Sequence, residues 1–75
     1  MGDTFLPDIR LTDLQAMLKK EPAGKPRDML LAAIKRKEGC SEEYIGECLG
    51  RAQSTISGWL HRLQSRGLEG RYDRS

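Results

Sequence analysis

The chain has 75 residues, with 13 Lys and Arg against 11 Asp and Glu, which gives a formal net charge of +2 at pH 7. A chain of this length forms one small domain, because it buries only about 60% of its unfolded surface. It has no run approaching the roughly 20 apolar residues of a membrane span and no signal-peptide pattern, so we predict a cytoplasmic protein without membrane contact.

The first quarter of the chain predicts an arm and one short helix. Residues 1–11 have no periodicity and predict an extended, partly mobile arm, although three apolar residues could dock on the core: Phe5, Leu6 and Ile9. Thr12 followed by Gln15 is the pattern of a capping box and predicts the start of a helix. Residues 12–25 are therefore interpreted as a short helix and a linker.

A longer apolar helix is expected next. Pro26 suits the first helical position and Gly39 suits the position just past the end. The helix has a broad buried stripe, formed by Met29, Leu30, Leu31, Ala32, Ala33 and Ile34. Its last turn carries Lys35, Arg36 and Lys37, which either oppose the helix dipole or contact phosphate.

Two amphipathic helices joined by a tight glycine turn follow, which is the pattern of a helix-turn-helix. Ser41 caps the first of them, and Gly50 supplies the positive φ of the turn. A small residue at Gly46 lets the two helices cross closely. The inward residues are predicted to be Tyr44 or Ile45, Cys48 and Leu49.

The second of these helices runs from Gln53 or Ser54 to Ser65. Its core stripe is Ile56, Trp59, Leu60 and Leu63. The helix-turn-helix core thus covers residues 26–68, and residues 69–75 form a tail or the start of a linker. Residues 66–75 are too short and too polar for a β-hairpin wing. The predicted fold is all-α, a small bundle of three to four helices with a helix-turn-helix and no wing.

Charge and side-chain size point to a DNA-reading surface on this last helix. Residues 41–50 hold three glutamates and no basic residue, whereas residues 51–67 hold three arginines, one histidine and no acidic residue. A helix in the major groove needs short side chains with donor and acceptor groups. The predicted base contacts are Gln53, Ser54, Ser57 and His61. The predicted phosphate contacts are Arg51, Thr55, Arg62 and Arg66. Gly58 suits either close approach to DNA or close packing of a neighbouring helix.

Other chemistry is disfavoured. Cys40 and Cys48 lack the close pairing and the further ligands of a zinc site, so we predict no metal, with Cys48 in the core and Cys40 at a helix start. His61 has serines nearby but no third catalytic group. We therefore expect no enzymatic activity, no cofactor and no small-molecule ligand.

The pattern over residues 27–74 resembles the N-terminal, homeodomain-like helix-turn-helix domain of bacterial and archaeal insertion-sequence transposases of the mariner-like superfamily. The residues that carry it are Gly39-x-Ser41, Ile45-Gly46, Leu49-Gly50, Ser54-Thr55-Ile56, Trp59-Leu60-x-Arg62, Gly67-Leu68-Glu69-Gly70 and Asp73. The resemblance implies that Thr55 and the four predicted base-contact residues meet the terminal inverted repeat, with Arg51 and Arg62 on phosphates. Full-length members carry catalysis in a separate ribonuclease-H-like domain, which this sequence does not contain.

Two other functions remain open. A small prokaryotic transcriptional regulator would use the same fold, and a homodimer would then match palindromic half-sites. A protein-interaction bundle without a DNA role would use an apolar patch instead.

Overall fold

A computed structural model describes residues 5–71, and within that range every regular element is helical. The helices are α1 (Leu11–Lys20), α2 (Lys25–Lys37), α3 (Glu42–Leu49) and α4 (Gln53–Arg66), followed by the 3-10 helix η2 (Leu68–Arg71). The prediction of an all-α bundle of three to four helices is confirmed, with four α-helices and no strand in residues 5–71.

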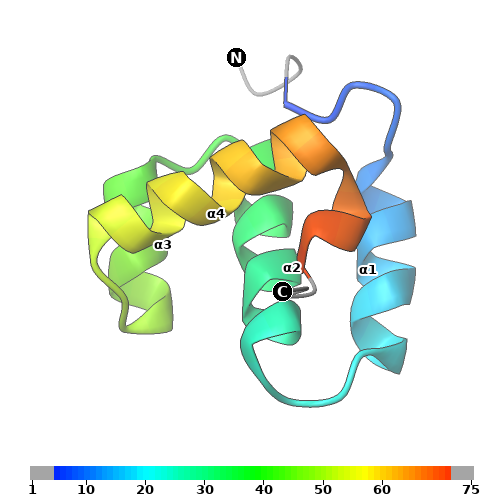
Figure 1. The fold of residues 1–75 in the computed structure, drawn as a ribbon, viewed down its shortest axis with the longest axis horizontal. Helices are drawn as coiled ribbons and strands as arrows, with labels where there is room; N and C mark the ends of the chain where they lie inside the picture. The colour runs from blue at the N-terminus through cyan, green and yellow to red at the C-terminus, as the bar shows by residue number, and fades with distance from the viewer. Residues whose placement is uncertain (1–4, 72–75) are drawn as a thin grey trace.

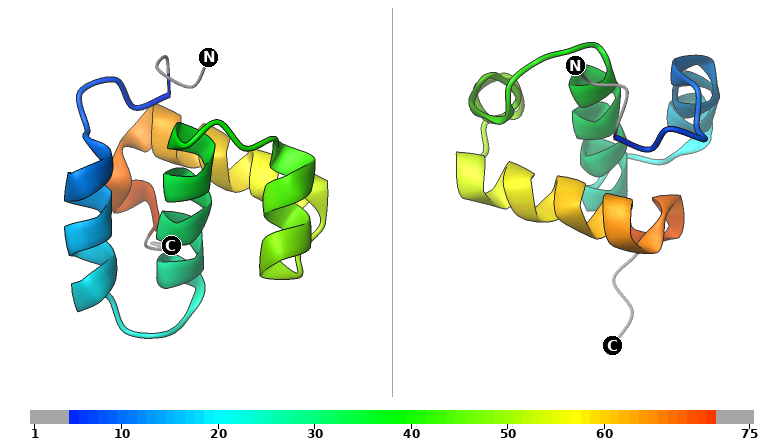
Figure 2. Two further views of the ribbon diagram at one scale, coloured as in Figure 1. Left: turned by 180° about the vertical axis from the view of Figure 1, so that it is seen from behind. Right: turned by 90° about the horizontal axis from the view of Figure 1, so that it is seen from above.

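The central element is α2, which contacts α1, α3, α4 and η2. Seen from above, α1, α2 and α3 stand side by side, and α4 runs across them on one side of the molecule (Figures 1 and 2). The residues buried between these elements are almost all aliphatic, namely Leu14, Met29, Leu30, Ala32, Ala33, Ile34, Ile45, Ile56, Leu60 and Leu63, with Phe5, Leu6 and Trp59. This arrangement leaves the side of α4 opposite the other helices uncovered by them.

The N-terminal segment is docked on this bundle from Phe5 onward, which confirms the alternative of docking for Phe5 and Leu6 over an extended arm. Phe5 and Leu6 are buried. The Lys37 ammonium donates to the carbonyl oxygens of Phe5 (2.9 Å) and Leu6 (2.8 Å), and the Leu6 amide donates to Gln64 Oε1 (2.9 Å). These bonds join the segment to the ends of α2 and α4.

Two helix starts differ from the sequence prediction. The capping box that begins at Thr12 is wrong, because α1 begins at Leu11 and the Arg10 amide donates to Asp13 Oδ2 at 3.3 Å. In α2 the first residue is Lys25, so Pro26 occupies the second position, where its missing N–H costs no helical bond either. The predicted turn at Gly39 is confirmed by its φ of 99°.

The expected tail from residue 69 is folded at its start. The chain turns after α4 and η2 contacts both α4 and α2. Gly70 is buried, and a Cβ there would lie 3.1 Å from the Arg62 carbonyl oxygen and from Arg66 Cβ. A larger residue would therefore push η2 away from α4. Asp73, part of the family resemblance, lies outside the described residues.

Candidate nucleic-acid interface

The turn between α3 and α4 has the geometry that its glycines predict. Gly50 has φ 69° and ψ 34°, the left-handed conformation that glycine adopts without a Cβ penalty. The Arg51 amide donates to the Gly46 carbonyl at 2.8 Å. A Cβ at Gly46 would lie 2.6 Å from the Arg51 carbonyl oxygen, so the small residue admits the backbone of the turn as well as the start of α4.

The short helix α3 is attached by Ile45 and Gly46, which are buried, while Ser41 Oγ accepts from the Tyr44 amide at its N-terminus (3.2 Å). Ile45, rather than Tyr44, is therefore the inward residue. The prediction that Cys48 belongs to the core is wrong, because its side chain is exposed. The buried arc of α3 is centred on Ile45 and Gly46, which turns position 48 toward solvent.

The longer helix α4 is held by its predicted core stripe. Ile56 and Leu63 are fully buried, and Leu60 and Trp59 are 4% and 6% exposed. Trp59 is thus a core anchor, as predicted. This stripe fixes which side of α4 faces outward.

The outward side of α4 carries the predicted base-contact residues. Gln53, Ser54 and His61 are exposed, and Ser57 is half-buried at the edge of this face. Apart from the adjacent residues and the backbone of α4 itself, no described heavy atom lies within 4 Å of the Cβ position at Gly58. Packing against another helix of this domain therefore does not explain that glycine. Ser65 is also exposed on this face, and helical spacing from Ser54, Gly58 and His61 could have found it.

The predicted phosphate contacts have unequal surroundings. Arg51 bonds Asp28 Oδ2 at 3.2 Å and lies 5.2 Å over the Trp59 ring centroid, so its guanidinium is held between α2 and α4. Thr55 and Arg62 are half-buried, whereas Arg66 is exposed. Arg62 and Arg66 line a shallow hollow of about 360 Å³ together with His61 and Ser65.

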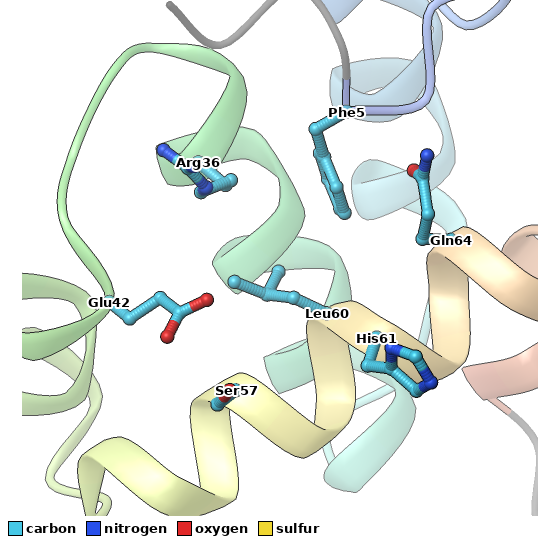
Figure 3. A pocket seen from close by; sticks show the side chains of 7 residues that line it. All are labelled: Phe5, Arg36, Glu42, Ser57, Leu60, His61 and Gln64. Atoms are coloured by element: carbon cyan, nitrogen blue, oxygen red, sulfur yellow. The ribbon is translucent and has the colours of Figure 1, made fainter.

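A second hollow, of about 290 Å³, lies on the other flank of α4 and also reaches His61 (Figure 3). Its remaining lining residues come from four parts of the chain: Phe5, Arg36, Glu42, Ser57, Leu60 and Gln64. From the sequence, Arg36 in the last turn of its helix either opposes the helix dipole or contacts phosphate. Only the tertiary fold brings it into the lining of the same hollow as Ser57 and His61.

The surface of α3 has the opposite character. Glu43, Tyr44, Glu47 and Cys48 are exposed, and Tyr44 is the exposed large hydrophobic residue of the described chain, at 53%. The neighbouring Cys48, and after it Cys40 and Glu47, favour the neutral phenol and raise the pKa of Tyr44 above its ordinary value of 10.0.

Residues 5–71 contain neither a metal-ligand cluster nor a membrane-spanning helix. No three His, Cys, Asp or Glu side chains there gather closely enough to hold a metal ion, and both cysteines are free. No helix in the same range combines the length and apolarity that crossing a membrane requires.

Comparisons of the chain with protein-family models, curated proteins and solved structures find no match. The transposase resemblance therefore rests on the quoted residues alone.

Proposed function

We propose that this chain is a double-stranded DNA-binding helix-turn-helix domain that reads the major groove with α4. The observation that carries the proposal is the outward face of α4, which is exposed, short in side chains and free of carboxylates. Hydrogen-bonding groups on such a face suit the edges of bases, which a helix must approach closely to read.

Gly58 supports the same function. Glycine in a helix interior costs about 1 kcal/mol relative to alanine. The open space above Gly58 means that no contact within the described chain compensates for this cost. A partner that approaches the helix backbone at this point, as base edges do, supplies a reason for the residue.

Cations lie where a phosphate backbone would pass. Arg62 and Arg66 line a hollow beside the reading face, and Arg51 is fixed at the start of α4 by Asp28 and Trp59. Arginine suits this position because its planar fork donates to two phosphate oxygens at once. Phosphate contacts orient the helix, and Gln53, Ser54, Ser57 and His61 then specify sequence.

A finer proposal follows from the family resemblance. The chain would recognise the terminal inverted repeat of an insertion sequence as the N-terminal part of a transposase, with no catalytic role of its own. Selection of preferred duplexes from a random library tests this: one asymmetric site supports it. A palindrome with half-sites about one helical turn apart, bound by a dimer, supports a transcriptional regulator instead.

The direct test is a titration of isotopically labelled protein with a mixed-sequence duplex at low and moderate salt. Amide shifts should cluster between Arg51 and Arg66 and weaken as salt rises, because phosphate contacts release counterions. Amides of α1 serve as the internal reference, since α1 packs chiefly on α2. Unchanged amide shifts on the outward face of α4 at both salt concentrations would contradict the proposal.

A second function has one observation in its favour. Tyr44 is exposed on α3 among carboxylates, and exposed tyrosines are frequent anchors of protein interfaces. A domain that binds a protein through α3 would show no shifts on α4 with any duplex. The same titration therefore distinguishes the two functions.

A further inference from the structure

We propose that Arg36 at the end of α2 contacts the second phosphate backbone of the bound duplex, opposite the one met by Arg62 and Arg66. This inference rests on the proposed DNA-binding function and deepens it. The interface would then contact the phosphate backbones of both strands and would be formed by α2 and α4 together.

The geometry that carries it is the pair of hollows on either side of His61. One hollow is lined by His61, Arg62, Ser65 and Arg66. The other, also reaching His61, is lined by Ser57 and Gln64 of α4 and by Arg36 (Figure 3). The outward ridge of α4 therefore lies between two depressions, each with an arginine in its wall.

A helix lying in the major groove has a phosphate backbone on each side, so positive charge is favourable on both of its flanks. The groove is about 12 Å wide and is bordered by one phosphate backbone along each edge. The cations of α4 itself, Arg62 and Arg66, lie on one flank, whereas the side chains of the opposite flank, Ser57 and Gln64, are neutral. Arg36 supplies the missing positive charge from a different element.

Arg36 keeps the means to bind an anion. Within residues 5–71 it makes one long hydrogen bond, from Nη1 to the Cys40 carbonyl at 3.4 Å, and no ion pair. A guanidinium has five N–H donors, so most of them are available. Glu42 lies in the same hollow, and its carboxylate opposes an approaching phosphate. The hollow thus holds one residue that attracts the backbone and one that weakens the attraction.

The test is the salt dependence of affinity of the full 75-residue chain for a fluorescein-labelled mixed-sequence duplex, followed by anisotropy. Arg36→Gln should make the log–log slope shallower by about 0.9, the value for one lost phosphate contact. Arg66→Gln should do the same from the other flank. Lys19→Gln, which removes an equal charge from the exposed surface of α1, should leave the slope unchanged.

Two further variants separate a DNA contact from a structural role of the Cys40 bond. Arg36→Lys should restore most of the slope. Glu42→Gln should raise affinity, because it removes the opposing carboxylate. Thermal unfolding of each variant checks that the fold is intact.

The outcomes distinguish this inference from the proposed function. Loss of slope in Arg66→Gln with the wild-type slope in Arg36→Gln overturns the role of Arg36 and leaves the DNA-binding function standing. Equal losses in Arg36→Gln and Lys19→Gln overturn it too, because the effect would then be one of net charge. A wild-type chain without salt-dependent binding removes both proposals.

Discussion

The two helices of the helix-turn-helix share one turn but differ in length, in exposed charge and in the residues that anchor them. The shorter, α3, is acidic on its exposed side and is attached by Ile45 and a glycine that no larger residue could replace without moving the turn. The longer, α4, is anchored by four large apolar side chains and exposes no carboxylate. The difference shows that packing within the protein explains the residues of α3, whereas the residues of α4 depend also on the face that the other helices leave uncovered.

The same substitution in the two helices should have opposite effects, and the larger is expected in α3. Gly46→Ala places a Cβ 2.6 Å from the Arg51 carbonyl oxygen. Overpacking of this kind costs about 2 kcal/mol of unfolding free energy. Urea denaturation should show a lower midpoint with an unchanged m-value. A midpoint at or above that of the wild type would mean that the turn yields freely.

Gly58→Ala is the matched control in α4. The added methyl meets open space, so the variant should gain about 1 kcal/mol of unfolding free energy from helix propensity. Thermal unfolding measures that gain. If α4 reads the groove as proposed, affinity for a selected duplex should fall although the fold is stronger. Unchanged affinity would show that bound DNA does not approach the helix backbone at residue 58.

Asp28→Asn tests how the start of α4 is held. The Arg51–Asp28 pair is partly exposed, at 44% and 33% of the side chains, so its loss should cost about 0.5 kcal/mol or less. On the DNA-binding proposal, duplex affinity should rise, because a carboxylate is removed beside Arg51. Trp59, the one tryptophan of the chain, reports any movement of the guanidinium above its ring by its fluorescence. A fall in affinity would show that Asp28 positions Arg51 for the contact.

The smallest effect concerns the exposed side of α3. The contact with Cys48 favours the neutral phenol of Tyr44, which raises its pKa above 10.0 in the folded state. The contact therefore adds stability below the unfolded pKa and loses it as pH rises through the folded one. Cys48→Ala should lower the Tyr44 pKa toward 10.0, as measured by NMR titration of the assigned ring. An unmoved pKa would mean that the thiol does not act on the phenol.

The sequence by itself determined the helices, the turn and the outward face of α4. Periodicity, caps and glycine conformations are local properties, and a helix of 14 residues repeats its pattern often enough to define a buried stripe. This is why Ile56, Trp59, Leu60 and Leu63 were predicted correctly. Exposure of Gln53, Ser54 and His61 on the opposite side follows from the same stripe.

Only the tertiary structure decided the phase of α3, the docking of Phe5 and Leu6 and the neighbours of each arginine. A helix of eight residues makes about two turns, so its sequence left Tyr44 and Ile45 as alternative inward residues and wrongly placed Cys48 in the core. Ion pairs and hollows join residues far apart in the chain, as with Arg51 and Asp28 or Arg36 and His61. Such contacts depend on how helices cross, and the spacing of residues along one helix does not encode that crossing.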